Sequence, residues 1–325
     1  MSGAGKSRDW LLYGPLAAGA VAFAIYGFLW SQGASEMRRA VSNWAEDQRA
    51  SGVDVTYEKI ATKGFPFFLR GAVSNVTIAE GSTWAWRAPQ LNIDALPLAL
   101  DRLIFSVREP HVIESEKFGR WRITAPDGRA SIGGDKEHLW IVDVESGAAE
   151  VEKVGGVESF FADAFLLTVA PSKEDHATIE ASLAATGLKT RNGAAARKLE
   201  AMVAATALEA LEESSQAWRA SGGKIEFRRI YLETEESKLQ LSGDLSLDAL
   251  GRPEGVLNVE AINPGPLTLT LAETGVIKQS DAQKVAAALT LAAIAGGGKV
   301  SAPLVFENGA ARIAGVRVAK LKPVY

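Results

Sequence analysis

The chain has 325 residues and a formal net charge of −4, with 47% hydrophobic and 23% charged residues. These values lie near globular averages, which excludes a disordered chain, a collagen-like repeat and a polytopic membrane protein. The charge is mildly acidic and no basic block follows the chain, so nucleic acid is not an expected partner. Because cysteine is absent, disulfides, thiolate metal sites and cysteine nucleophiles are excluded.

An uncharged run from Trp10 to Trp30 is the strongest physical signal in the sequence. As a helix rising about 1.5 Å per residue, it is long enough to cross a hydrocarbon core of about 30 Å. Small residues at positions 33–35 leave a cleaved signal peptide as an alternative, but the run exceeds the roughly 7–15 residues of a typical signal-peptide core. We therefore predict an uncleaved transmembrane anchor at residues 10–30, with a short cytoplasmic tail at residues 1–9.

The spacing of apolar residues changes from helical to strand-like after residue 51. Residues 31–51 predict a stalk helix, because Met37, Ala40, Val41, Trp44 and Ala45 recur at helical spacing. From residue 52 onwards, apolar positions alternate along short segments, which predicts an antiparallel β-meander. The first expected strands are at residues 53–57, 73–78, 84–86, 91–93, 121–123, 139–144, 165–169 and 179–183.

Two helices are expected among the later strands. An apolar stripe predicts a long helix at residues 194–221, which either covers the sheet or acts as a removable lid. The stripe consists of Leu199, Met202, Val203, Leu208 and Leu211. Residues 280–295 predict a second, very apolar helix.

Strands resume between and after these helices. We expect them at residues 224–233, 239–247, 257–261, 267–271, 300–306 and 311–318, with a hairpin turn at Asn308-Gly309. The predicted fold class is α+β, a mostly antiparallel meander with one long covering helix, a second apolar helix and a single transmembrane helix. The β-rich body spans residues 52–325, with halves at 52–191 and 192–325.

Motifs that carry chemistry are weak in this chain. Gly3–Ser7 resembles the end of a phosphate-binding loop, but the first glycine of that motif would fall before the chain starts. His111, His138 and His176 have no second metal ligand nearby in sequence, which favours solvated roles. We therefore expect no catalytic, cofactor or metal site and no enzymatic activity, with a periplasmic hydrolase as the weaker alternative.

Aromatic residues form the most informative group, and they are the predicted ligand-binding residues: Phe65, Phe67, Phe68, Trp84 and Trp86. In strand geometry Trp84 shares a face with Trp86, and Phe65 with Phe67, whereas Phe68 points to the other face. The two tryptophans most simply help to close a core. The alternative is that they line an apolar groove for a hydrophobic ligand.

Glycine-containing motifs carry a family resemblance. Gly64-Phe65-Pro66 precedes a strand, Trp86–Leu91 follows, and Leu241–Asp248 leads to Gly251 and Gly255. Over most of residues 35–322 the chain resembles an uncharacterised bacterial envelope family similar to the AsmA-like and YdgA-like proteins. This resemblance implies one inner-membrane span, a β-rich periplasmic body, a link to lipid homeostasis and no catalytic residue. The chain is shorter than the large lipid carriers of this kind, which argues against a bridge between two membranes.

These observations together predict a single-pass protein of the bacterial inner membrane, with its amino terminus in the cytoplasm and its body in the periplasm. We expect it to bind or handle a hydrophobic envelope component without covalent chemistry. The expected partner is membrane lipid or another hydrophobic ligand. The alternative is a structural or assembly factor, in which a sheet edge at residues 239–247 and 257–271 binds another envelope protein.

Overall fold

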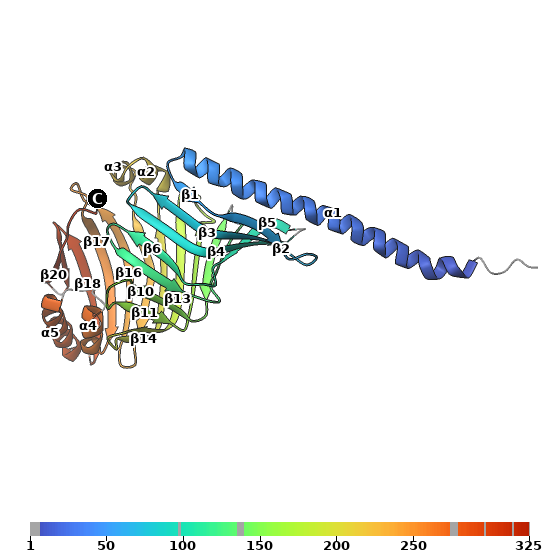
Figure 1. Cartoon of the computed structure of the whole chain (residues 1–325). Coiled ribbons are helices and arrows are strands. Elements are labelled where there is room, and N and C mark those ends of the chain that lie inside the picture. Colours follow the sequence, from blue (N-terminus) through green and yellow to red (C-terminus); the bar gives the residue numbers. More distant parts are fainter. Residues whose placement is uncertain are drawn as a thin grey trace, which may run out of the picture. The chain divides into compact units, whose positions relative to one another are not determined.

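The computed structural model describes the backbone of residues 7–96, 99–134, 140–273, 279–295, 297–313 and 315–324. The chain divides into two compact units, Met1–Gly119 (unit 1) and Arg120–Tyr325 (unit 2). This boundary differs from the division near residue 191 that the sequence suggested. Both units consist mainly of antiparallel strands (Figure 1), so the prediction of a mostly antiparallel β-fold with a few helices is confirmed.

Unit 1 combines one long helix with a small antiparallel sheet. Its elements are α1 (Ser7–Ala50), β1 (Asp54–Thr56), β2 (Lys59–Lys63), β3 (Leu69–Glu80), β4 (Trp84–Leu96), β5 (Ala99–Ser106) and β6 (His111–Ser115). The central pair is β3 and β4. The short strands β1 and β2 pair with the free side of β3, and β5 and β6 pair with that of β4.

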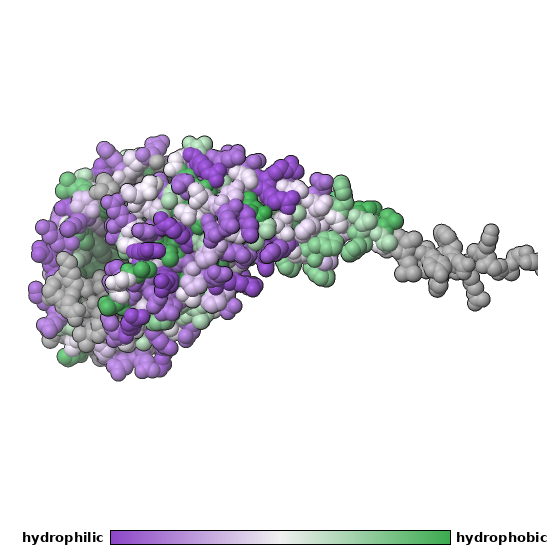
Figure 2. Space-filling view, viewed as in Figure 1, coloured by the Kyte–Doolittle hydropathy of each residue, from purple (hydrophilic) through white to green (hydrophobic). Residues whose placement is uncertain are grey.

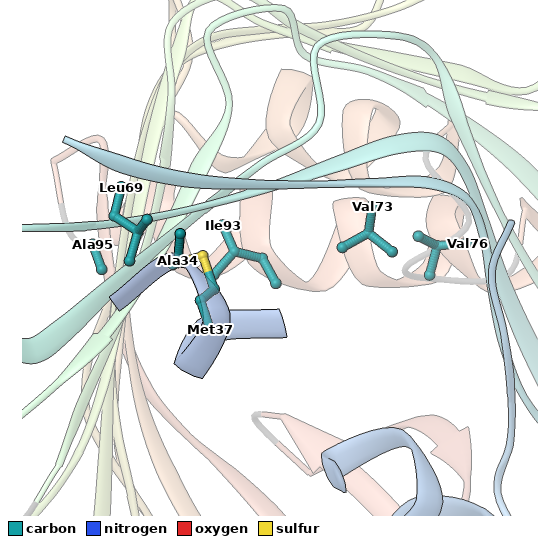
Figure 3. Close-up of a cluster of buried hydrophobic side chains, with 7 residues drawn as sticks. All are labelled: Ala34, Met37, Leu69, Val73, Val76, Ile93 and Ala95. Atoms are coloured by element: carbon teal, nitrogen blue, oxygen red, sulfur yellow. The ribbon is translucent and has the colours of Figure 1, made fainter. Parts of the chain in front are cut away.

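Helix α1 packs on one face of this sheet and closes the core of unit 1 (Figure 3). The buried side chains of this core are Ala34, Met37, Leu69, Val73, Val76, Ile93 and Ala95. The backbone of Asn75 is left-handed, with φ 52°, and Val73 and Val76 on its two sides belong to the same cluster. This local break explains why the apolar alternation in the sequence shifts between residues 73 and 76.

The apolar stripe of α1 differs in part from the predicted one. Met37 and Ala45 are buried, whereas Ala40 and Trp44 are exposed. Residues three or four positions apart share a helix face, so the stripe that meets the sheet runs from Ala34 through Met37 to Ala45. The segment expected to be a stalk is therefore part of the unit 1 core.

The predicted transmembrane anchor lies at the start of α1. Its residues 10–17 lie outside the described side chains, which begin at Ala18 in this helix. Within the described residues, none of the helices has the combined length and apolar character needed to cross a membrane. The structure therefore does not support the predicted anchor.

Unit 2 is built mainly as a continuous antiparallel meander. Its strands are β7 (Gly119–Thr124), β8 (Arg129–Gly133), β9 (Ile141–Ser146), β10 (Ala149–Lys153), β11 (Ser159–Ala162), β12 (Ala164–Pro171), β13 (Ile179–Thr190), β14 (Ala195–Ala205), β15 (Ile225–Glu233), β16 (Lys238–Leu247), β17 (Pro253–Ile262), β18 (Lys299–Glu307), β19 (Ala310–Ile313) and β20 (Val316–Lys320). Each strand from β13 to β20 pairs with the next. The other side of β13 pairs with β11 and β12.

Two helices cover the last strands of unit 2, α4 (Pro264–Glu273) and α5 (Gln279–Ala295), which lie beside β18 and β20 in Figure 1. The second apolar helix that the sequence predicted is thus confirmed as α5. Its Val285, Leu289 and Ala293 pack with Val259 and other buried residues of the strands. The predicted hairpin turn is also present, since Asn308 and Gly309 have φ 51° and 73° between β18 and β19.

The prediction of a long helix at residues 194–221 is wrong. Residues 195–205 form β14, and only the short helices α2 (Leu208–Glu213) and α3 (Ser215–Ala220) follow. Strand β14 is hydrogen-bonded to β13 on one side and to β15 on the other. These non-local pairings override the helix propensity of the Ala- and Leu-rich sequence, because propensity is only a weak preference of each residue.

Two further expectations are corrected in unit 2. Residues 267–271 belong to α4 rather than to a strand, since Pro264 and Pro266 occupy its first turn, where a missing N–H has no cost. The segments 239–247 and 257–261 do not form a sheet edge either. They lie within β16 and β17, and each of these strands is paired on both sides.

Candidate functional site

Residues 64–68, which we call the aromatic loop, connect β2 to β3 in unit 1. The backbone N–H groups of Phe67 and Phe68 donate to the carbonyl oxygen of Gly64, at 3.0 and 3.1 Å, and close a turn. Gly64 has φ 104°, and a Cβ at this position would lie 2.5 Å from the carbonyl oxygen of Phe68. The strand geometry predicted for residues 65–68 is therefore wrong, because these local hydrogen bonds replace pairing with a neighbouring strand.

The aromatic loop is held against α1 by aromatic contacts and hydrogen bonds. The ring of Phe65 lies 5.5 Å from Phe23, 6.2 Å from Tyr26 and 5.5 Å from Trp30, measured between ring centroids. The hydroxyl of Tyr26 donates to the carbonyl oxygen of Pro66. The indole Nε1 of Trp30 donates to the carbonyl oxygen of Phe68 at 3.1 Å. Both ends of the loop are thus fixed to one segment of the helix.

Large apolar side chains remain exposed around this contact. Phe67, at the tip of the loop, is 82% exposed. We define the apolar collar as the exposed apolar residues of the loop and of the adjacent helix, namely Val21, Phe23, Ile25, Phe28, Leu29, Phe65, Phe67 and Phe68. Figure 2 shows the apolar part of α1 in green beside the more polar surface of unit 1. Contiguous exposed apolar surface of this kind is typical of a membrane or protein interaction site.

The two predicted tryptophans lie at the other end of the same strands. Trp84 is paired with Glu80, whereas Leu69, which follows the loop, is paired with Ala95. At about 3.3 Å per residue, Trp84 is roughly 36 Å from Ala95 along β4. The five predicted site residues therefore form two separate groups, and only the phenylalanines belong to the apolar collar.

Both tryptophans are half-buried and partnered. The indole Nε1 of Trp84 donates to Glu80 Oε2 at 2.9 Å. Trp86 packs against the unit 1 core and meets the ring of His111 edge-on, with centroids 6.0 Å apart. The Nδ1 atom of His111 is buried and has no hydrogen-bond partner. These contacts fit the interpretation in which the tryptophans help to close a core.

The burial of His111 gives the stability of the chain a dependence on pH. Burial lowers the pKa of His111 below 6.5, while a hydrogen bond with the Glu109 backbone opposes this shift. Between the lowered pKa and 6.5, the folded state binds fewer protons than the unfolded state, so stability rises with pH and is complete above about 6.5. We expect His111→Gln to flatten the acid side of the melting temperature plotted from pH 5 to 8. The exposed His176, changed to Gln, is the control that should leave the curve unchanged.

Sequence reasoning identified the loop phenylalanines but missed their partners on α1. Phe23, Tyr26 and Trp30 were assigned only to a membrane span, and nothing in their spacing indicates a contact with a loop some forty residues later. In the described part of the chain, no cluster of three or more histidine, aspartate or glutamate side chains is arranged to hold a metal ion. His138 lies outside the described residues.

Comparison with known proteins gives one family match. A family model described as an uncharacterised protein conserved in bacteria, DUF2125, matches residues 30–322. The match covers both units apart from the first part of α1 and the last three residues. No curated protein and no solved structure matches the chain.

Proposed function

We propose that this chain, which belongs to the DUF2125 family of bacterial proteins, is a non-catalytic membrane-anchored protein of the cell envelope that binds lipid. In this proposal residues 10–30 anchor the chain in the inner membrane, with the amino terminus in the cytoplasm and the strands in the periplasm. The apolar collar is the surface that contacts lipid. Unit 1 then acts as a lipid-binding module held at the bilayer surface.

The observation that carries this proposal is the exposed phenyl ring of Phe67. Transfer of a fully exposed phenyl group out of water is favourable by roughly 1.5–3 kcal/mol. The exposed collar residues of α1 lie within the uncharged run at residues 10–30, so the collar is continuous with that run. Continuity with this run favours lipid over a protein as the occupant of the collar. Aromatic side chains such as Tyr26 and Trp30 are also typical of the boundary between lipid and water.

Photocrosslinking of the full chain in nanodiscs tests this proposal. The discs contain phosphatidylcholine with a diazirine in its acyl chain, and trypsin separates the two groups of predicted residues, because it cleaves after Lys63, Arg70 and Arg87. We expect lipid adducts on peptide 64–70 and few on peptide 71–87, which carries both tryptophans. Adducts confined to peptide 71–87 would contradict the assignment to the apolar collar and favour the tryptophan groove.

Phe67→Ser should lower the adduct yield on peptide 64–70 by roughly tenfold, since loss of the phenyl group forfeits about 1.5 kcal/mol or more. Phe118→Ser is the matched control, because Phe118 is also an exposed phenylalanine of unit 1 but lies outside the collar. If both variants keep the adduct yield of the parent chain, Phe67 does not contribute to the lipid contact, and the adducts arise only because helix α1 holds the loop near the bilayer. If the full chain is extracted gently and co-purifies with a stoichiometric protein partner instead of lipid, this result would favour the assembly-factor alternative.

A further inference from the structure

A small pocket whose lining includes charged and amide residues lies in unit 1 on the face of β3 that α1 does not cover. Leu69 and Val73 belong to the core under α1, and Arg70 and Ala72 alternate with them along the strand, so they point to the opposite face. The pocket has a volume of about 130 Å³, which is ample for a tetrahedral anion, since one water needs roughly 10–15 Å³. Its lining residues are Lys63, Arg70, Ala72, Gln90, Asn92 and Arg108.

Strand register brings these side chains together from separate segments. Arg70 stands between Lys63 of β2 and Asp94 of β4, and Ala72 is paired with Asn92. The guanidinium Nε and Nη2 of Arg70 donate to the two carboxylate oxygens of Asp94, each at 2.5 Å. Asp94 therefore neutralises Arg70 and holds it in place.

The remaining cations of the pocket have no counterion in the described part of the chain. Neither Lys63 nor Arg108 lies within 4.0 Å of a described carboxylate oxygen. Lys63 also stands directly opposite Arg70, whose charge Asp94 already balances, so the charge of Lys63 remains without a counterion. Lys63 and Arg108 therefore leave the pocket with an excess of positive charge that an anion can balance.

A buried amide supplies the polar specificity of the pocket. Asn92 is 4% exposed, and its Oδ1 accepts a hydrogen bond from Gln90 Nε2 at 2.7 Å. Asn92 also lines the pocket, which places its side-chain amide beside the enclosed space. An amide N–H is a hydrogen-bond donor, so Asn92 can donate to an acceptor oxygen of a ligand at this position.

The pocket adjoins the aromatic loop. Lys63 immediately precedes Gly64, and the guanidinium carbon of Arg70 lies 5.0 Å from the ring centroid of Phe68. We infer that this pocket binds the phosphate group of an anionic phospholipid whose acyl chains lie along the apolar collar. This inference rests on the proposed function and names the lipid class. Arginine and lysine are well suited to phosphate oxygens, and free inorganic phosphate shares that chemistry.

A competition between headgroups tests the inference on the full chain in nanodiscs. The discs contain equal amounts of phosphatidylglycerol and phosphatidylcholine with the same diazirine acyl chain, and the ratio of their adducts on peptide 64–70 is measured. We expect phosphatidylglycerol adducts to dominate in the parent chain. In Lys63→Gln/Arg108→Gln the ratio should fall by roughly tenfold, because two charge-assisted contacts are lost. The peptide of this variant begins at Ile60, since cleavage after residue 63 is lost.

Two further variants separate a specific site from general attraction to negative lipid. Lys59→Gln/Lys117→Gln removes the same charge from exposed positions of unit 1 outside the pocket and should keep the parental ratio. Ala72→Val leaves the charge unchanged but places two methyl groups in the pocket. It should lower the headgroup ratio as Lys63→Gln/Arg108→Gln does. The inference would be wrong if Ala72→Val kept the headgroup ratio of the parent chain. It would also be wrong if Lys59→Gln/Lys117→Gln lowered this ratio as much as Lys63→Gln/Arg108→Gln.

Calorimetry with inorganic phosphate distinguishes the two sources of the anion. We expect no saturable heat when phosphate is titrated into the full chain in phosphatidylcholine discs. Saturable binding that disappears in Lys63→Gln/Arg108→Gln would assign the pocket to a free anion and overturn the lipid assignment. The proposed function is judged separately from adducts on peptide 64–70 in phosphatidylcholine discs. If these adducts form while the headgroup ratio stays near one in every variant, only the inference about the pocket fails.

Discussion

Gly243→Ala is expected to destabilise unit 2 by roughly 2–6 kcal/mol, as the sum of about 1–3 for a strained backbone and about 1–3 for overpacking. Gly243 lies inside β16 with φ 141°, a conformation that side-chain-bearing residues rarely adopt. A Cβ here would lie 2.2 Å from the carbonyl oxygen of Val256 and 3.0 Å from the Cα of Leu257. Both atoms belong to the backbone of β17, which is fixed by β18 on its other side, so the clash has no simple relief.

Gly147→Ala is the matched control for this substitution. A Cβ on Gly147 would meet nothing closer than 3.9 Å, and its φ lies outside the left-handed region. The control should change stability by less than about 1 kcal/mol and can stabilise, because alanine restricts the unfolded chain. Thermal unfolding of the full chain in an uncharged detergent, followed by circular dichroism, compares the two. If Gly243→Ala melts together with the control, the close approach of β16 and β17 is wrong.

The same contact explains a motif that stood out in the sequence. Gly255 on β17 has φ 145°, and its Cβ would lie 2.2 Å from the carbonyl oxygen of Asp244. Gly243 and Gly255 therefore allow two neighbouring backbones to approach each other from both sides. The strand expected at residues 239–247 already contains Gly243, but Gly255 was expected in the connection before residues 257–261, whereas the structure places both glycines inside paired strands. Spacing alone cannot separate the two roles, because both need a residue without a side chain.

Local patterns in the sequence predicted many of the strands, but they missed β2, β5, β6, β8, β10 and β11 and assigned β14 to a long helix. Alternation of apolar residues identified β12, β13 and β15, because every second side chain of a strand lies on the same face of the sheet. The failure at residues 194–221 has a physical cause, since alanine, leucine and glutamate all favour a helix and are also compatible with a strand. The choice was made by pairing with β13 and β15, and β15 begins about twenty residues later in the chain. A short stretch of sequence does not contain both partner strands, so it cannot indicate the free energy gained by pairing with them.

The candidate site shows the same limit. The loop phenylalanines could be identified because aromatic residues around a proline are unusual, and Phe67 proved to be highly exposed. The pocket could not be identified, because Lys63, Arg70 and Asn92 meet only through the registers of β2, β3 and β4, and Arg108 joins them from the connection after β5, which pairs with β4. Each residue taken alone is an ordinary polar residue of a strand or turn. Only the three-dimensional structure shows that two cations without a described carboxylate partner and one buried amide line the same pocket.

Ala45→Asp is the second substitution with a large expected effect, and it tests whether the last turns of α1 belong to unit 1. Ala45 is 0% exposed, so the new carboxylate would be buried without a partner. We expect a loss of several kcal/mol in the stability of unit 1, the scale of an unpaired buried charge. Ala40→Asp is the control, because Ala40 is exposed on the same helix and pays the same loss of helix propensity, about 0.5 kcal/mol.

Hydrogen exchange of the full chain locates the effect of Ala45→Asp within the molecule. If α1 closes the core of unit 1, amides of β3 and β4 lose protection in Ala45→Asp and keep it in Ala40→Asp. Amides of β16 and β17 in unit 2 keep their protection in both variants, since stability is not uniform across a structure and the two units are separate compact bodies. Equal protection of β3 in the two variants would show that α1 is a detached stalk. In that case the loop contacts with Tyr26 and Trp30 would no longer be anchored by a packed helix, and the apolar collar would lose its fixed geometry.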